Sequence, residues 1–369
     1  MCICGTLLDR RDWLAMTMAS AVALADSKAL GDSEALAAES SAEVYAVLRT
    51  TVSVDVHSHA AGMIFGDSMD SMSDKLAIGM RAGNLSAVCL AHVPDGPVIG
   101  RRPDGVIGMM RQPNPGELYK GHLARMDWVD RLVSQGGIRR VLTLAELQDA
   151  KSKGDPAMIQ DVEGCDFLDG NLERIEEAVK RGIRVVQLVH YIPNGIGDFQ
   201  TGPVVHNGLT GFGATVVREL NRAGVVIDVA HATEEMTRGV ANATSKPLLL
   251  SHTALQESKA MGQTPLAGRQ ISPEHARMVA ATGGVIGIWH FFHGIERYVQ
   301  GIREMVDIVG VEHVGVGTDQ QTAPGTLQDY AAFPRLVDEM LKSGFSAEEV
   351  GKMLGGNFLR LWQEVLRPA

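Results

Sequence analysis

Eight short apolar runs recur along the chain, and each ends in or beside a polar residue. The runs are rich in Val, Ile and Leu and cover residues 52–57, 87–93, 158–163, 185–190, 225–231, 248–252, 285–290 and 314–319. Near-continuous apolar runs of this length are typical of strands in a parallel sheet that is covered on both faces. The pattern therefore predicts eight buried, parallel strands.

Stretches with the helical spacing of apolar residues separate these runs, as at Phe212, Val216, Val217 and Leu220. Helices are expected at 33–48, 117–133, 171–181, 212–223, 234–243, 273–281, 295–309, 327–342 and 346–362. Eight strand–helix units predict an α/β fold, a (β/α)8 TIM barrel, with an open doubly wound sheet as the structural alternative. The glycine- and proline-rich segment 94–117 is expected to form a long irregular loop over the barrel mouth.

Chemically active side chains gather at the ends of the predicted strands. Seven of the twelve histidines lie there, together with a glutamate and an aspartate. In a TIM barrel the functional residues come from the C-terminal ends of many strands, so this placement favours the barrel over the open sheet. The set is His57, His59, His92, Glu163, His190, His231, His252, His290 and Asp319.

Five of these residues have the composition of a two-metal site. His57 and His59 are two positions apart on a strand, so both point to the same side and can bind one ion. His231 and His252 are candidates for a second ion, and the carboxylate of Glu163 can bridge the two. Two adjacent divalent ions lower the pKa of a water molecule and polarise a carbonyl group, which suits hydrolysis.

Two further residues are candidate catalytic groups. Asp319 can accept a proton and pass it to a leaving nitrogen, and His190 can stabilise a developing oxyanion. His92 and His290 are left open between a supporting role at the site and a structural role. The other five histidines are expected to be structural, because they fall in predicted helices or loops: His122, His206, His275, His293 and His313.

Charge and the first residues set further bounds. The formal net charge of −10 and the lack of any Lys/Arg block argue against a nucleic-acid partner. Arg10 and Arg11 precede an apolar run, so residues 1–25 are expected to be a twin-arginine signal peptide that exports the protein to the periplasm. A buried N-terminal helix in a cytoplasmic protein is the alternative. The run is too short for a stable membrane span.

The remaining chain is divided into a linker with an N-terminal helix at 26–50 and the barrel at 51–369. Beyond the leader only two cysteines remain, Cys89 and Cys165. Both fall in or beside predicted strands, which does not indicate a disulfide framework.

The chain resembles the membrane (renal) dipeptidase family of zinc peptidases, within the amidohydrolase superfamily. The matching phrases run in order from DVHSH through DVEG, LVHYIPNGIGD, GLTGFGATVVRELNRAGVVIDVAH, LLLSHT and EHVGVGTD to LGGNFLRLW. The resemblance implies a barrel with two zinc ions, held by His57, position 59, Glu163, His231 and His252. It also implies that His190 contacts the substrate carbonyl, that Asp319 handles the proton and that Arg269 binds the substrate carboxylate.

Three positions depart from the family pattern. His59 stands where the family usually has aspartate, which makes the first metal site richer in nitrogen. Gln270 replaces the usual asparagine after Arg269, and Gln320 follows Asp319 where an aromatic residue is common. These departures leave the substrate open.

The expected function is hydrolysis of the amide bond of small dipeptides, including those with a C-terminal D-residue, by water that two divalent ions activate. One alternative is an amidohydrolase acting on a lactone, lactam or cyclic amide, and another is a non-catalytic metal-binding barrel. By resemblance alone, a homodimer is expected.

Overall fold

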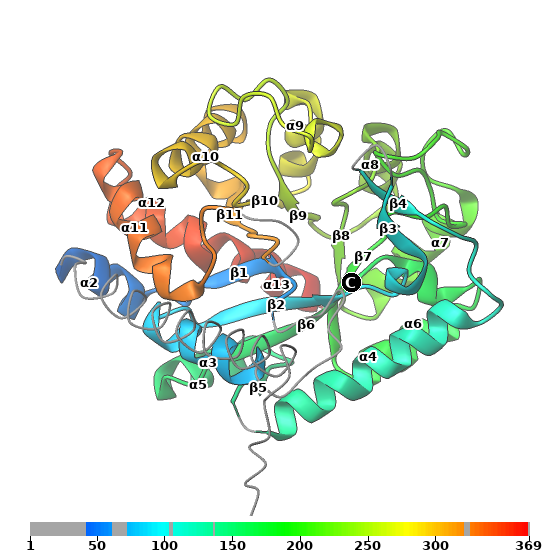
Figure 1. The fold of residues 1–369 in the computed structure, drawn as a ribbon, viewed down its shortest axis with the longest axis horizontal. Coiled ribbons are helices and arrows are strands. Elements are labelled where there is room, and N and C mark those ends of the chain that lie inside the picture. The colour runs from blue at the N-terminus through cyan, green and yellow to red at the C-terminus, as the bar shows by residue number, and fades with distance from the viewer. Residues whose placement is uncertain (1–41, 61–71, 103–105, 136, 321–324, 368–369) are drawn as a thin grey trace, which may run out of the picture.

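The computed structural model describes residues 42–60, 72–102, 106–135, 137–320 and 325–367 (Figure 1). The predicted signal peptide, 1–25, lies outside the described residues. Of the segment 26–50, the described part forms helix α2 (Ala42–Thr50). The chain then enters the first strand of the barrel.

Eight parallel strands form a nearly closed barrel, in the order in which they follow along the chain. Backbone hydrogen bonds connect the two ends of the sheet, from Asp319 N to His57 O (2.9 Å) and from His59 N to Gln320 O (3.2 Å). All eight predicted strands and the predicted TIM barrel are thereby confirmed. The strands are β1 (Val54–Ser58), β2 (Ala87–His92), β6 (Ala157–Glu163), β7 (Ile183–Gln187), β8 (Val226–Asp228), β9 (Leu249–Thr253), β10 (Val285–Ile288) and β11 (Val314–Val316).

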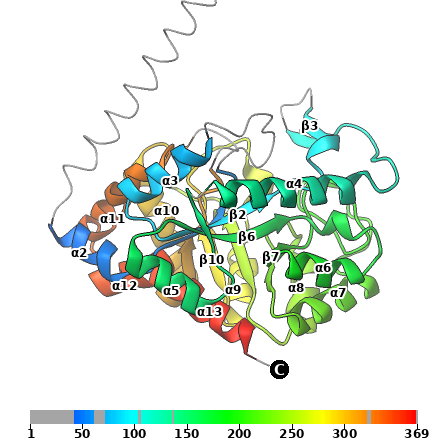
Figure 2. The ribbon, with the colours of Figure 1, turned by 90° about the horizontal axis from the view of Figure 1, so that it is seen from below.

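Helices surround the barrel, as the two perpendicular ribbon views show (Figures 1 and 2). Helix α9 begins at Pro273, as predicted, because Ser272 accepts a hydrogen bond from His275 N. Helix α5 (Leu144–Lys153) was not predicted although Thr143 caps it, and the predicted helix 346–362 is divided into α12 (Ala347–Gly351), a π-helical turn and α13 (Asn357–Leu366). Helix α11 begins at Phe333, later than predicted, because a short 3-10 turn precedes it. The helices are α3 (Met72–Ala82), α4 (Glu117–Ser134), α5 (Leu144–Lys153), α6 (Glu173–Lys180), α7 (Gly211–Arg222), α8 (Glu234–Ala243), α9 (Pro273–Ala281), α10 (Ile295–Val309), α11 (Phe333–Lys342), α12 (Ala347–Gly351) and α13 (Asn357–Leu366).

The segment predicted as an irregular loop, 94–117, contains a small antiparallel hairpin instead. Its strands are β3 (Ile99–Arg101) and β4 (Ile107–Met109), and a further short strand, β5 (Arg139–Arg140), pairs with β6. The hairpin packs in one apolar cluster with Tyr191, which follows strand β7. It therefore stands beside the barrel mouth, as expected of this segment, although its structure is regular.

The lower half of the barrel interior is apolar and closed. Ile159 and Cys89 belong to one buried cluster with Phe358 and Trp362 of α13. Gly287 leaves no room for a side chain, since a Cβ there would meet the Ser251 carbonyl oxygen at 1.9 Å. With this end filled, a ligand can reach the interior only from the carboxyl ends of the strands.

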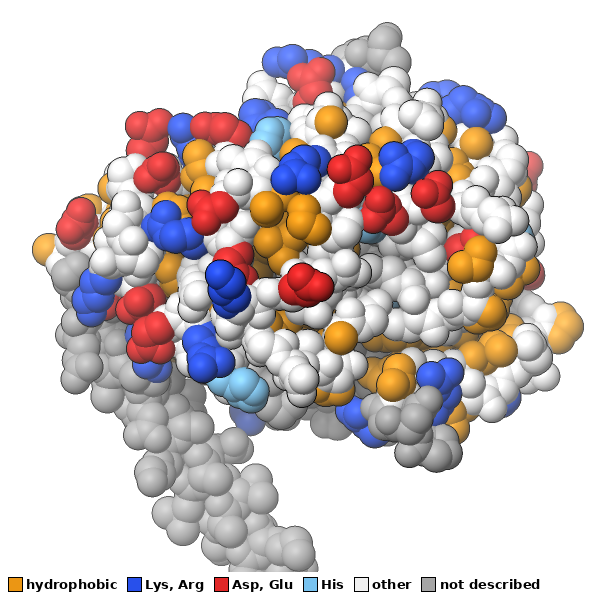
Figure 3. Space-filling view, turned by 90° about the horizontal axis from the view of Figure 1, so that it is seen from above, with side chains coloured by type: hydrophobic (Ala, Val, Ile, Leu, Met, Phe, Trp, Pro, Cys, Tyr) orange, Lys and Arg blue, Asp and Glu red, His pale blue; other side chains and the backbone are white. Residues whose placement is uncertain are grey.

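The described surface mixes charges of both signs. On the face seen in Figure 3, acidic and basic side chains alternate between apolar patches. No helix in the described ranges is long and apolar enough to cross a membrane.

Candidate metal centre

The local backbone turns the key side chains toward the barrel axis. The register of β1 against β2 slips between Asp55 and Ser58, so that His57 faces the interior above the apolar Val56. His231 and Asp319 have positive φ values of 65° and 55°, a conformation that is uncommon outside glycine and concentrates at functional sites. These strained strand ends aim both side chains at the same centre.

Glu163 lies at the middle of five imidazoles from four different segments, since His57 and His59 share one. Its Oε1 is 3.0 Å from His231 Nε2, 3.5 Å from His252 Nε2 and 3.7 Å from His57 Nε2. Its Oε2 is 3.1 Å from His59 Nε2 and 3.3 Å from His190 Nε2. Asp319 joins the cluster through its Oδ1, which lies 3.4 Å from His59 Nε2. The seven residues predicted for the site are therefore together.

The spacing of these atoms fits divalent metal ions. Two ligands of a tetrahedral zinc ion, each at 2.0–2.1 Å from it, lie about 3.4 Å apart, close to the separations found here. Two groups of buried residues, which share Glu163, offer ligand atoms that all lie within 4.8 Å of one another: His57, His59 and Glu163, and Glu163, His231 and His252. Glu163 Oε2 has no hydrogen-bond partner in the described structure.

Arg269 also reaches this cluster. Its Nη2 donates to His252 Nε2 at 3.0 Å and its Nη1 donates to the side-chain oxygen of Gln200. Because one lone pair serves one partner, this hydrogen bond and a metal bond from His252 Nε2 exclude each other. Its neighbour Gln270, which stands where the family usually has asparagine, donates to the carbonyl of Leu255.

Electrostatics favours the ligand forms of His231, His252 and Glu163, but not of His59. Burial holds the pKa of His231 and of His252 well below the usual range, so both imidazoles are neutral, the form that binds metal. Burial would raise the pKa of Glu163, but the nearby histidines outweigh it and hold the pKa well below the usual range. Burial also lowers the pKa of His59, yet Glu163 and Asp319 raise it to about 9.

The structure adds two carboxylates that the sequence analysis missed. Asp95 Oδ1 lies 2.8 Å from His190 Nδ1, and Asp161 Oδ2 lies 3.3 Å from His57 Nδ1. Asp95 is far from His190 in sequence and gave no signal. Asp161 did give one, since it precedes Glu163 by two positions on a strand and so shares its face.

The remaining histidines make other contacts. His92 Nε2 pairs with His122 Nδ1 at 2.9 Å, and His290 Nδ1 accepts the N–H of Leu327. His275 Nε2 pairs with the hydroxyl of Thr237. None of these four histidines is among the residues that contact Glu163.

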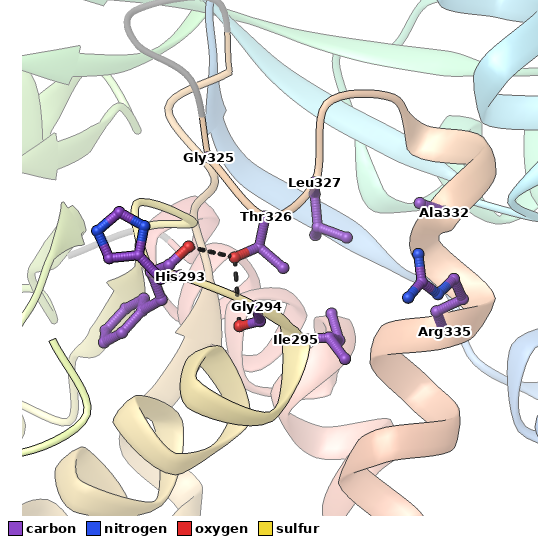
Figure 4. A pocket seen from close by; sticks show the side chains of 9 residues that line it. His293, Gly294, Ile295, Gly325, Thr326, Leu327, Ala332 and Arg335 are labelled. Atoms are coloured by element: carbon purple, nitrogen blue, oxygen red, sulfur yellow. Dashed lines mark hydrogen bonds between the residues drawn. The ribbon is translucent and has the colours of Figure 1, made fainter. Parts of the chain in front are cut away.

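A cavity of about 410 Å³ lies outside this cluster, between the segments that follow β10 and β11. His293, Thr326 and Arg335 line it, and the Thr326 hydroxyl donates to the carbonyl oxygens of Phe292 and Gly294 (Figure 4). None of the residues around Glu163 lines it, so we place the chemistry at the histidine cluster.

A barrel that gathers histidines and a carboxylate at the carboxyl ends of its strands is the architecture of a metal-dependent hydrolase. The chain belongs to the membrane dipeptidase family (peptidase family M19), whose family model matches residues 42–368. This confirms the predicted family and, at family level, the predicted metal-dependent hydrolase. Dipeptidase verJ of Clonostachys rogersoniana is 28% identical over 250 residues, which span 64% of this chain and 62% of that protein.

Solved structures show the same fold. The probable dipeptidase PvdM of Pseudomonas aeruginosa superposes with a TM-score of 0.75 over 88% of this chain and 98% of its own, at 18% identity. A metallopeptidase of Rhodobacter sphaeroides, liganded with a phosphinate mimic of the dipeptide L-Ala-D-Ala, gives a TM-score of 0.66 at 20% identity. That match covers 78% of this chain and 89% of the Rhodobacter chain.

Proposed function

We propose that this protein hydrolyses small dipeptides, including those with a C-terminal D-residue, with two zinc ions as cofactors. The observation that carries the proposal is the position of Glu163 between two pairs of imidazoles, His57 with His59 and His231 with His252. The family supports the reaction, and the mimic bound by the Rhodobacter protein supports the substrate class. When bound, the ions would supply Lewis acidity and a water of lowered pKa.

His190 is suited to hold the carbonyl oxygen of the scissile amide. Burial lowers its pKa, but the carboxylates of Asp95 and Glu163 outweigh burial and raise it. Asp95 also accepts the backbone N–H of Tyr191, so one carboxylate fixes both the ring and its segment. With Nδ1 held by Asp95, a protonated His190 can donate from Nε2 to a developing oxyanion.

Asp319 and Arg269 complete the assignment. The carboxylate of Asp319, beside His59, is placed to accept a proton and deliver it to the leaving amine. The guanidinium of Arg269 presents a planar fork that matches the carboxylate of a dipeptide. Arg269 has five N–H donors, so it can bind a substrate carboxylate while it also donates to His252.

The test is an assay of the purified, metal-free protein with and without zinc on matched L-L and L-D dipeptides, next to lactam, lactone and cyclic-amide substrates. We expect zinc-dependent turnover of dipeptides, and a loss of about 10²–10⁴-fold in kcat for Asp319→Asn with a small change in zinc content. Turnover of the cyclic amides alone would assign the site to the other amidohydrolase class. Turnover of neither would leave a metal-binding barrel without this activity.

We also propose that the chain is exported through the twin-arginine route to the periplasm and that it works as a homodimer. Replacing Arg10 and Arg11 by lysine should retain the protein in the cytoplasm, which fractionation of expressing cells measures. Light scattering of the purified protein tests the dimer.

A further inference from the structure

Two buried carboxylates lie below Glu163 inside the barrel and have no part in the proposed reaction. Asp161 stands two residues before Glu163 on β6, and Asp228 ends β8. Both are fully buried. Because alternate residues of a strand face the same side, Asp161 points into the barrel as Glu163 does. We call Asp161 and Asp228 the floor carboxylates.

Asp161 faces the far nitrogen of His57. Its Oδ2 is 3.3 Å from His57 Nδ1. Among the described residues, the two oxygens of Asp161 and this ring nitrogen have no hydrogen-bond partner. The other ring nitrogen, Nε2, lies near His59 and Glu163. A small rotation of the ring would let Nδ1–H donate to Asp161 and would fix Nε2 toward the ligand cluster.

Asp228 approaches the same histidine from a second strand. Its Oδ1 accepts the backbone N–H groups of Ala230 and Ser251 at 2.9 and 3.0 Å, which fixes the carboxylate. Its Oδ2 has no partner among the described residues. One oxygen of Asp228 lies within 4.8 Å of ring nitrogens of both His57 and His252. The two floor carboxylates thus lie near one imidazole of each proposed metal site, His57 of the first and His252 of the second.

This arrangement is unfavourable for the fold alone. Among the described residues, three carboxylate oxygens are buried without a hydrogen bond, and each such group destabilises the fold. The residues before them on the inner faces of β6 and β8, Ile159 and Val226, are apolar and offer no donor. A stable interior rarely retains such groups unless another partner compensates them. The nearest source of compensation is the cation centre above them.

We propose that Asp161, supported by Asp228, is a positioning residue of the metal centre that holds His57 with Nε2 directed at the ion. The inference rests on the proposed binding of divalent ions, and not on the dipeptide substrate. Histidine ligands are commonly oriented by a carboxylate on their second nitrogen, and loss of such a partner costs about 10–100-fold in metal affinity. Such an orienting carboxylate matters at this site, because His57, His59 and Glu163 offer the ion only one carboxylate, and the second site shares it.

The experiment compares zinc affinity with the stability of the metal-free protein. Asp161→Leu removes the acceptor and keeps the branching of the side chain, and Asp161→Asn is the milder second variant, of similar volume. For both we expect one zinc ion to bind about 10–100-fold more weakly in a chelator competition titration. The metal-free variants should be as stable as the wild type or more so in urea, because Asp161→Leu removes two buried oxygens that have no partner among the described residues and Asp161→Asn removes their charge. Asp228→Asn keeps the acceptor for both backbone N–H groups, and it should also lower the affinity for zinc.

Asp198→Asn is the matched control. Asp198 is buried as well, but its oxygens accept three backbone N–H groups, from Val205, His206 and Gly208. This variant should lose stability with or without zinc and keep its intrinsic zinc affinity. Unchanged zinc affinity in both Asp161 variants overturns the proposal, and so does a loss of metal-free stability like that of the control. A wild type that binds zinc without cleaving dipeptides would refute only the proposed function.

Discussion

The inner face of strand β6 passes through two opposite environments within a few residues. Ile159 lies in the apolar lower half of the barrel, in one cluster with Phe358 and Trp362, whereas Asp161 and Glu163 face the histidines of the upper half. Both environments are fully buried. The lower half gains free energy from the apolar area it removes from water. The upper half instead buries ionisable groups, which costs free energy unless a ligand compensates them.

This difference predicts that substitutions can impair ligand binding and the stability of the fold separately. A change in the upper half should remove ligand binding and leave the folded chain intact. A change in the lower half should weaken the fold and leave the affinity of the remaining folded molecules unchanged.

The largest effect is expected for Glu163→Gln. The carboxylate that both proposed sites share becomes a neutral amide, so zinc affinity should fall by more than the roughly 100-fold that loss of an outer-shell partner causes. Dipeptide turnover should be lost with it. Elemental analysis after gel filtration measures the zinc content, and thermal unfolding of the metal-free protein tests the fold. A variant that retains two zinc ions per chain would show that Glu163 is not the bridge.

A smaller effect of the opposite kind is expected for Ile159→Ala. Removing this buried side chain should lower the free energy of unfolding by about 2–5 kcal/mol, through lost burial and a cavity in a closed interior. Zinc affinity of the folded protein should stay within about a factor of two, on the order of 0.4 kcal/mol. Urea unfolding and chelator competition give the two quantities. If zinc affinity fell as steeply as stability, the two halves would not be independent.

The sequence predicted the upper half well because strand periodicity determines which residues meet. Once eight strands run parallel, their carboxyl ends converge, and His57, Glu163 and His252 must lie at one rim. A different local signal explains the accurate start of α9, where a capping serine and a proline mark the first turn. Local signals of this kind can be recognised without any knowledge of the tertiary structure.

Other features depend on contacts that are distant in sequence. Asp95 reaches His190 only because the segment carrying the β3–β4 hairpin packs against Tyr191. Strands of three residues carry too little periodicity to be distinguished from a loop, so the hairpin was missed. The orientation of Arg269 toward His252 likewise follows from the tertiary fold, so only its residue type can be read from the sequence.

The smallest expected effect concerns a histidine pair outside the metal centre and sharpens the comparison. His122 stacks on Phe167 and pairs with His92, without a carboxylate partner like that of His190. Burial lowers the pKa of His122 to about 3. Between pH 3 and 6.5 the unfolded chain therefore binds more protons than the folded chain, so this contribution to stability is complete above pH 6.5 and declines as the pH falls below it.

For His122→Gln we expect a flatter decline of the free energy of unfolding between pH 6.5 and 5. The difference from the wild-type decline should be about 2 kcal/mol or less, since 1.5 pH units correspond to roughly that free energy. Urea unfolding at several pH values measures it, with His293→Gln, a substitution of an exposed histidine, as the matched control. If His122→Gln declined as steeply as the wild type, this pair would not contribute to acid sensitivity. The acid sensitivity of the barrel would then have to arise elsewhere, at the metal centre or at the buried His275 and His290, whose pKa burial lowers to about 4.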